Sequence, residues 1–191
     1  MIYEDLALDE DFYEKCSFFT KEILRWNKIH NLTGAKTQKE VWENIYDSIY
    51  PIKFLPDIKT VLDIGTGAGF PGLILAFAHK KSSFLLVEPR NKRAAFLNFI
   101  ISSLELKNVK VEKKRIQKIK PKPFDLITSR AVDKTFNLLK LCKPFVKKDT
   151  LLLFYKGTEV EKELDMIKDC DFNIIEKDKR RYLLIKGSKC F

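Results

Sequence analysis

A run of apolar residues that ends in three alternating glycines constrains this 191-residue chain more than any other feature of its sequence. The apolar run covers residues 61–64, and an amphipathic segment, residues 73–80, follows the glycines Gly65, Gly67 and Gly69. This order predicts a buried strand, a tight turn and the start of a helix. Because glycine carries no side chain, the backbone of such a turn stays open to a ligand.

An acidic residue at the end of the next apolar run indicates what the glycine turn binds. Glu88 directly follows residues 83–87, so its carboxylate is expected at the tip of a second strand. A carboxylate in that place accepts hydrogen bonds from the two hydroxyls of a ribose. The glycine turn and Glu88 together predict a nucleoside-like cofactor, and a glycine-rich turn without a ligand is the alternative.

The spacing of the glycines distinguishes two kinds of cofactor. The dinucleotide-binding pattern is G-x-G-x-x-G, and Phe70 occupies the position of its third glycine. A pyrophosphate needs the close approach that this glycine permits, so Phe70 argues against NAD and a dehydrogenase. The tighter D-x-G-x-G pattern, from Asp63 to Gly67, suits a cofactor without phosphate. It resembles motif I of the class I methyltransferases, which use S-adenosylmethionine.

Length and composition predict one domain with a small appendage and no metal site. No apolar run is long enough to span a bilayer, and the first fourteen residues carry six acids and no base, so neither a membrane protein nor a leader peptide is expected and the predicted location is cytoplasmic. His30 and His79 stand alone, and the cysteines lack C-x-x-C spacing. We expect four reduced, mostly buried thiols: Cys16, Cys142, Cys170 and Cys190.

The charge of the chain favours a polyanionic partner. The formal net charge is +10, and the densest basic block lies between residues 107 and 122, where Glu112 is the only acid. Such a balance suits nucleic acid, and an excess of lysine that only solvates the surface is the alternative. Lys113, Lys114 and Arg115, in the middle of this block, are candidate RNA-binding residues.

The N-terminal part of the chain predicts two helices that form a cap over residues 1–56. Apolar residues recur at spacings of three and four over residues 9–30, which places them on one face of a helix. A second helix is expected over residues 37–49, with Thr37 as its N-cap and Glu40 completing a capping box.

Strands and helices alternate over the rest of the chain, residues 57–191. The expected strands are residues 60–64, 83–87, 109–112, 124–129, 150–155, 171–175 and 181–186. The expected helices are residues 71–80, 92–104, 134–142 and 159–168. Alternation predicts an α/β fold with a mostly parallel, seven-stranded sheet and helices on both faces. The last two strands are joined by a short link and must be antiparallel, as in the Rossmann-like class I methyltransferase fold.

Several short strings, in one order from Trp26 to Arg181, resemble those of the RsmG (GidB) family, the 16S rRNA (guanine-N7) methyltransferases. They are W-N-K and N-L-T in residues 26–33, N-I-Y-D-S in 44–48, G-T-G-A-G-F-P-G in 65–72, K-R and F-L in 92–97, S-R-A in 129–131, Y-K-G in 155–157, and Arg181. Asn44 stands where the family usually carries histidine, and Glu88 where many members carry aspartate.

This resemblance implies S-adenosylmethionine-dependent methylation of the N7 of a specific guanine in 16S rRNA, on the RNA or on a precursor of the small ribosomal subunit. With the glycine loop, it makes these residues the expected cofactor contacts: Asp63, Gly65, Gly67, Phe70, Glu88, Ile116, Gln117 and Arg130. For Ile116, a plain core position is an equal alternative. Lys156 and Arg181 are expected either to bind rRNA phosphates or only to extend into solvent at the ends of their strands.

Arg130 is the expected catalytic residue. It ends the fourth strand, at the edge where open α/β sheets place their active sites. Enzymes that methylate exocyclic amines carry N-P-P-Y or D-P-P-Y there, whereas this chain has Ser129, Arg130 and Ala131. Guanine N7 needs no proton removed, so an arginine that positions the base would suffice. A surface salt bridge at Arg130, another methyl acceptor, and an RNA-binding module without activity are the alternatives.

Overall fold

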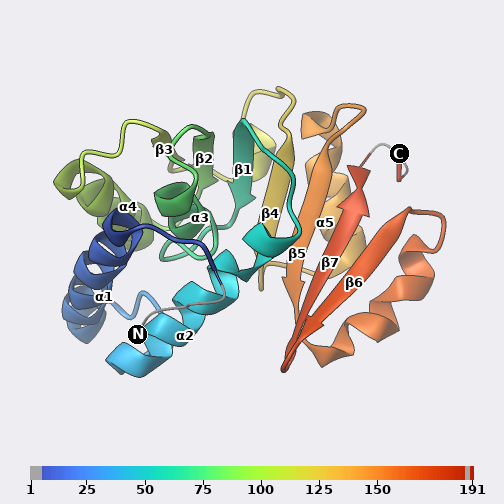
Figure 1. Ribbon diagram of the computed structural model, residues 1–191. Helices are drawn as coiled ribbons and strands as arrows, with labels where there is room; N and C mark the ends of the chain where they lie inside the picture. Colours follow the sequence, from blue (N-terminus) through green and yellow to red (C-terminus); the bar gives the residue numbers. More distant parts are fainter. Residues whose placement is uncertain (1–5, 188–189) are drawn as a thin grey trace.

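The computed structural model describes residues 6–187 and 190–191, and part of the acidic N-terminal segment, residues 1–5, lies outside this description (Figure 1). Seven strands form one sheet in the order β3-β2-β1-β4-β5-β7-β6. The strands are β1 (Thr60–Ile64), β2 (Ser83–Val87), β3 (Val109–Glu112), β4 (Leu126–Arg130), β5 (Leu151–Lys156), β6 (Phe172–Lys177) and β7 (Arg180–Lys186). β7 runs antiparallel to β5 and β6, and the other pairs are parallel. The predicted fold class and the reversed strand are confirmed.

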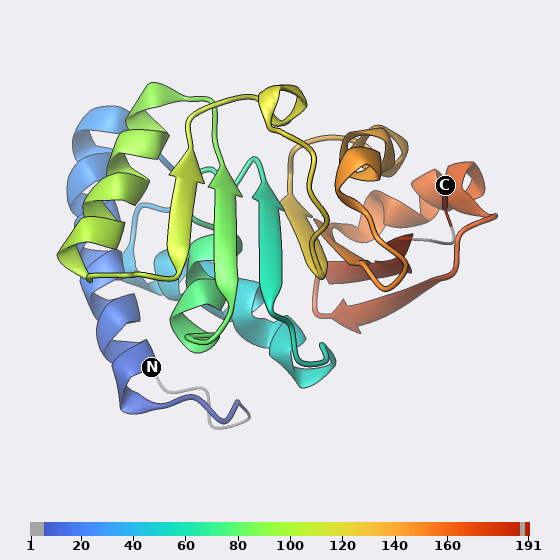
Figure 2. The same ribbon diagram turned by 90° about the horizontal axis from the view of Figure 1, so that it is seen from above.

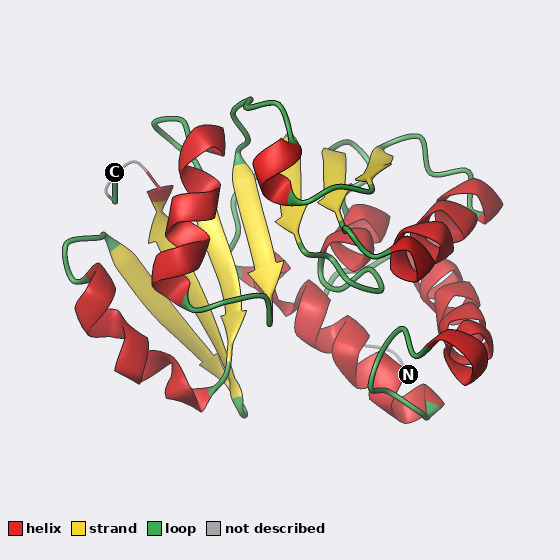
Figure 3. Cartoon of the chain, turned by 180° about the vertical axis from the view of Figure 1, so that it is seen from behind, coloured by secondary structure: helices red, strands yellow, loops and turns green. Residues whose placement is uncertain are grey.

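Helices cover both faces of the sheet, as predicted. They are α1 (Glu10–His30), α2 (Gln38–Ile49), η1 (Tyr50–Lys53), α3 (Gly72–Ala78), α4 (Asn91–Ser103), η2 (Ile116–Lys118), α5 (Thr135–Cys142), η3 (Lys143–Phe145) and η4 (Thr158–Ile167). The helices α1 to α4 share one buried apolar cluster with one face of the sheet, and α5, η3 and η4 share a second cluster with the other face (Figures 2 and 3). The helix expected over residues 159–168 is a 3₁₀ helix.

The N-terminal cap packs on the glycine loop and on the helices α3 and α4 that cover the sheet. Phe19 of α1 is fully buried and meets the rings of Phe70, Phe77 and Phe96 at centroid distances of 5.4, 6.2 and 5.8 Å. The capping box predicted for α2 is present, with Glu40 N–H donating to the Thr37 hydroxyl. The predicted segments 1–56 and 57–191 therefore share one core over their described residues.

The prediction of four reduced cysteines is wrong for two of them. Cys170 and Cys190 form a disulfide with a Cα–Cα distance of 4.7 Å. Cys170 precedes β6 and Cys190 follows β7, and an antiparallel hairpin brings the start of its first strand beside the end of its second. Cys16 and Cys142 are free and buried, and burial raises the pKa of the Cys142 thiol to about 12.

Gly72 is expected to tolerate no side chain, because a Cβ there would lie 2.6 Å from Asp63 Cβ, Asp63 Oδ2 and Leu86 Cδ2. Gly72→Ala should therefore destabilise the protein by about 1–3 kcal/mol through overpacking, which a lower urea midpoint would reveal. Gly157→Ala is the matched control, since no atom of the described residues lies within 4 Å of the added methyl group. Equal midpoints for the two variants would contradict this prediction.

Candidate functional site

Two adjoining cavities open at the carboxyl ends of the parallel strands. The inner cavity, of about 490 Å³, lies among the glycine loop, the ends of β2 and β4 and the start of η2. The outer cavity, of about 880 Å³, lies between α2 and the turn from β6 to β7. Thr33 and Gly34, which follow α1, line both cavities, so the two spaces meet at the cap.

The glycine loop forms one wall of the inner cavity. Gly65 and Gly67 have φ angles of +68° and +61°, in the left-handed region that favours glycine. The N–H groups of Gly65 and Thr66 donate to the carbonyl of Val87 at 2.9 and 3.2 Å, which fixes the loop to the end of β2. Both glycines line the cavity as predicted for cofactor contacts, and neither presents a side chain to it.

Asp63 acts behind this loop rather than in the cavity. Its carboxylate is fully buried and accepts hydrogen bonds from Gly72 N–H at 2.9 Å and the Thr128 hydroxyl at 2.8 Å. Burial raises the pKa of Asp63, and these two hydrogen bonds oppose that rise. Asp63 does not line the inner cavity, where it was predicted to contact a cofactor, because its carboxylate binds Gly72 and Thr128 instead.

Glu88 ends β2 and lines the inner cavity. Its side chain is almost wholly buried, at 3% exposure. Oε2 accepts from Gly67 N–H at 3.0 Å and Oε1 from Arg90 N–H at 2.8 Å. A carboxylate oxygen has two acceptor sites, so each still has one available for a hydroxyl group. This is the arrangement that the predicted ribose contact requires.

The far wall of the cavity combines apolar and polar groups. Ile116 and Gln117, at the start of η2, line it, and Ile116 also belongs to the buried cluster that includes α5, so its place is compatible with either interpretation. Phe70 lines the wall nearer the cap. The guanidinium carbon of Arg130 lies 4.8 Å from the centre of the Phe70 ring.

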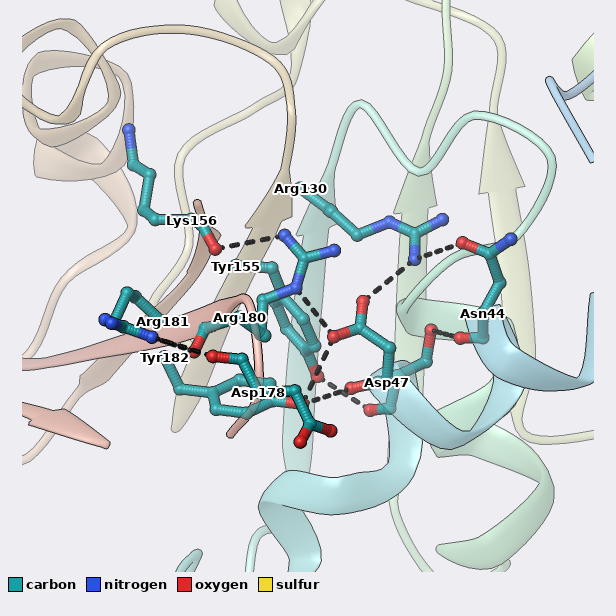
Figure 4. A network of polar contacts seen from close by, with 10 residues as sticks. Asn44, Asp47, Arg130, Tyr155, Lys156, Asp178, Arg180, Arg181 and Tyr182 are labelled. Carbon is teal, nitrogen blue, oxygen red and sulfur yellow. Dashed lines mark hydrogen bonds and ion pairs between the residues drawn. The ribbon is translucent and has the colours of Figure 1, made fainter. Parts of the chain in front are cut away.

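Two side chains of the N-terminal cap hold the guanidinium of Arg130 in place (Figure 4). Its Nη1 donates to Asn44 Oδ1 at 3.1 Å and to Asp47 Oδ2 at 3.2 Å, both on α2. Its side chain is 15% exposed; burial lowers the pKa of Arg130, and the charge of Asp47 opposes this. Asn44, which stands where the family usually carries histidine, thus gives Arg130 a neutral hydrogen-bond acceptor.

Asp47 links Arg130 to a second arginine, Arg180, that was not predicted from the sequence. Asp47 Oδ1 accepts from Arg180 Nε at 2.6 Å and from the Tyr182 hydroxyl at 3.2 Å. Figure 4 shows both guanidinium groups beside the Asp47 carboxylate. Neighbouring residues of a strand point to opposite faces, so Arg180 reaches Asp47 and the adjacent Arg181 does not.

Arg181 and Lys156 lie in ion pairs away from this carboxylate. Arg181 pairs with Glu176 at 3.1 Å and Glu161 at 3.5 Å. Lys156 Nζ pairs with Glu163 at 3.0 Å and donates to the Asp133 carbonyl at 3.0 Å. A contact of either side chain with phosphate, as predicted, requires these pairs to open.

The basic residues after β3 are exposed instead. Lys113, Lys114 and Arg115 all have exposed side chains, and Arg115 lines the inner cavity. Lys114 pairs with Glu112 at 3.1 Å. Three of the predicted RNA-binding residues are therefore gathered beside the cavity mouth.

Neither a metal site nor a membrane span is found in the described part of the chain. No group of three histidine, cysteine, aspartate or glutamate side chains there could hold a metal ion. Among residues 6–187, no helix is both long enough and apolar enough to cross a bilayer.

Comparison with known proteins identifies close relatives in sequence and in fold. The family model GidB, described as rRNA small subunit methyltransferase G, matches residues 12–186. The ribosomal RNA small subunit methyltransferase G of Aliarcobacter butzleri is 45% identical and that of Wolinella succinogenes 46%, with coverage of 96% and 95% of this chain and 94% and 93% of theirs.

Solved structures share the fold at low sequence identity. A ribosomal protein L11 methylase from Lactobacillus delbrueckii subsp. bulgaricus superposes with a TM-score of 0.63 at 15% identity over 80% of this chain and 79% of its own. A SAM-dependent methyltransferase from Aquifex aeolicus has a TM-score of 0.58 at 22% identity over 73% and 90%.

Proposed function

This chain belongs to the GidB family of rRNA small subunit methyltransferases, and we propose that it transfers a methyl group from S-adenosylmethionine to the N7 of a specific guanine in 16S rRNA. The observation that carries this proposal is Arg130, which lines the inner cavity beside the glycine loop and is fixed by two side chains of the cap. The reaction then takes place in the cytoplasm, on 16S rRNA or a precursor of the small subunit.

The inner cavity suits S-adenosylmethionine, which supplies a methyl group activated by its sulfonium. The acceptor sites that remain on Glu88 fit the two ribose hydroxyls. Gly65 and Gly67 leave room for the amino acid end, because a side chain on either would project from a strained backbone. Ile116 and Gln117 form the wall that an adenine ring would contact.

The chemistry at guanine N7 asks for positioning rather than proton transfer. N7 has a lone pair at neutral pH, so no general base is needed. Within the described structure, Nε and Nη2 of Arg130 make no hydrogen bond and can donate to guanine O6, which neighbours N7. Holding a nucleophile in line with the methyl group can reduce the barrier by roughly 7–11 kcal/mol.

The activity is tested directly on RNA that lacks the modification. Purified protein would be incubated with S-adenosylmethionine and either naked 16S rRNA or small subunits from cells without this gene, and modified nucleotides would be mapped by mass spectrometry. The proposal expects one new N7-methylguanine in 16S rRNA. Methylation of another nucleobase, or of none in either substrate, would contradict it.

The exposed block beside the cavity mouth is expected to bind RNA phosphates. Replacing Lys113, Lys114 and Arg115 with alanine should make the slope of log affinity against log salt concentration less steep. The slope should decrease by roughly 0.7–0.9 for each phosphate that the variant no longer neutralises. The measurement is a filter-binding titration of 16S rRNA at several salt concentrations.

A matched variant removes the same charge from the opposite edge of the sheet. Lys59, Lys81 and Lys148 are exposed and precede β1, β2 and β5. Their replacement by alanine should leave the salt dependence unchanged. If both triple variants flatten it equally, the effect reflects net charge and not a docking site.

A further inference from the structure

The outer cavity adjoins the inner one, and none of the expected cofactor contacts lines it. Asn44 and Asp47 line the outer cavity, and the arginine to which they bind, Arg130, lines the inner one. A ligand in the outer cavity would therefore reach the place where Arg130 faces the cofactor. Its volume of about 880 Å³ lies within the range of small-molecule sites and leaves room for a nucleotide.

The boundary between the cavities carries one uncompensated positive charge. Among the described residues, Asp47 is the only carboxylate bound to Arg130 and Arg180, and the three side chains are only 16%, 15% and 29% exposed. Arg180 is fixed further by a hydrogen bond from Nη1 to the Lys156 carbonyl at 3.1 Å. Two guanidinium groups against one carboxylate, with little access to water, favour an anionic or oxygen-rich ligand.

The other acids around the outer cavity are already engaged. Glu40 accepts from the N–H groups of Lys36 and Thr37 at 2.6 and 3.0 Å, as part of the capping box. Glu43 pairs with Lys39 at 4.0 Å, and Asp178 pairs with Lys177 at 3.3 Å. None of these three acids forms an ion pair with Arg130 or Arg180 in the described structure, so Asp47 remains the one carboxylate shared by the two arginines.

The second guanidinium has a donor left for a ligand. Nε and Nη1 of Arg180 are occupied by Asp47 and the Lys156 carbonyl, and Nη2 makes no hydrogen bond with the described residues. In Figure 4, this nitrogen lies on the side that faces Arg130. Both arginines thus present unused N–H groups on the same side of Asp47.

We propose that the outer cavity receives the guanine nucleotide that is methylated, with Arg180 donating to its phosphate and Arg130 to its O6. Asp47 is a positioning residue, since it holds the two guanidinium groups at a fixed separation. This inference rests on the proposed function and adds to it a site for the acceptor nucleotide. The ligand class is a guanosine 5′-phosphate unit turned out of the RNA.

Calorimetric titration of the protein saturated with S-adenosylhomocysteine tests this site. Guanosine 5′-monophosphate should bind more tightly than adenosine 5′-monophosphate. Arg180→Gln should weaken guanosine 5′-monophosphate binding about tenfold or more, as expected when a hydrogen bond between charged groups is removed, and leave the binding of unphosphorylated guanosine unchanged. Equal weakening for nucleotide and nucleoside would overturn the contact between Arg180 and phosphate.

Lys186→Gln is the matched control, because Lys186 lies at the other end of the same strand, outside both cavities, and pairs with Asp171. It should leave nucleotide binding unchanged, and a tenfold decrease would overturn the assignment to Arg180. Wild-type protein that methylates rRNA without binding guanosine 5′-monophosphate would overturn the acceptor site alone. Absence of methylation would instead reject the proposed function.

A measurement on the wild-type protein covers the case in which Arg180→Gln does not fold. Photolabelling with 8-azidoguanosine 5′-monophosphate, in the presence of S-adenosylhomocysteine, should attach the probe to peptides that line the outer cavity, residues 40–47 or 177–182. Labels found only in other peptides would overturn the proposal.

Discussion

Replacement of Arg130 by alanine is expected to slow methyl transfer by a factor of at least about 100, with little change in S-adenosylmethionine binding. The size follows from removing a preorganised donor at the reacting base, where a single such group contributes a factor of about 100 to 1,000. The variant still has Glu88 and the glycine loop to bind the cofactor, and neither forms a hydrogen bond with Arg130 in the described structure. Single-turnover rates and calorimetric titration measure the two quantities separately.

Arg130→Lys should recover little of this rate. The planar guanidinium of Arg130 reaches Asn44, Asp47 and the Phe70 ring at the same time, and an ammonium group cannot reproduce that geometry. A lysine variant as fast as the wild type would show that Arg130 supplies only a positive charge.

The wild-type rate should be nearly constant from about pH 6 to 9, because no proton leaves guanine N7 in the reaction. Burial lowers the pKa of Arg130, but a guanidinium keeps its charge throughout this range, so Arg130 adds no step to the profile. A bell-shaped profile would reveal an acid and a base that the proposed mechanism lacks.

Gly65→Val is expected to weaken S-adenosylmethionine binding at least about 100-fold. Gly65 has a φ of +68°, a conformation that a β-branched residue rarely adopts, and a Cβ there would lie 2.6 Å from Val132 Cγ2. The side chain would also project from a wall of the inner cavity. Calorimetric titration with S-adenosylhomocysteine measures the decrease in affinity.

Gly157→Ala is again the control, since Gly157 lies outside the inner cavity and an added methyl group meets no atom of the described residues within 4 Å. It should bind S-adenosylhomocysteine as the wild type does. Gly65→Val protein that is folded and binds within threefold of the wild type would contradict the assignment of this loop to the cofactor.

The strands beside the glycine loop could be predicted from sequence to the residue. The bounds of β1, β2 and β3 agree with the prediction because glycines, Glu88 or polar residues end each apolar run. The prediction is less accurate for β4, which was expected over residues 124–129 and covers Leu126–Arg130. Phe124 is apolar and buried without being in the strand, so hydrophobicity alone does not define that strand's start.

The inner cavity could be predicted and the outer one could not, for a physical reason. Gly65, Gly67 and Glu88 follow the ends of two adjacent parallel strands, β1 and β2, so the pairing of these strands fixes their proximity. Asp47 and Arg180 are 133 positions apart and meet only through the packing of α2 on β7. Arg180 and Arg181 are adjacent, so they point to opposite faces of β7. No local pattern shows which of the two faces Asp47 before the register of β7 is known.

The Cys170–Cys190 disulfide was not predicted, although the hairpin that forms it was. The spacing of cysteines along the sequence does not identify this pair, because a disulfide depends on the distance between the two ends of the antiparallel strands. Once β6 and β7 are paired, the start of one and the end of the other are neighbours. The pairing of β6 with β7, and not the sequence spacing of the cysteines, therefore determines that Cys170 and Cys190 can form a disulfide.

The place of β7 in the sheet makes the last strand of the described chain as important for the fold as the first. β7 is the final strand of the described chain, yet it lies between β5 and β6, and it carries the arginine that binds Asp47. A stop codon or frameshift at position 180 would preserve the glycine loop and Glu88 but would separate β5 from β6 and remove Arg180. We expect such an allele to be inactive, although it still encodes residues 1–179.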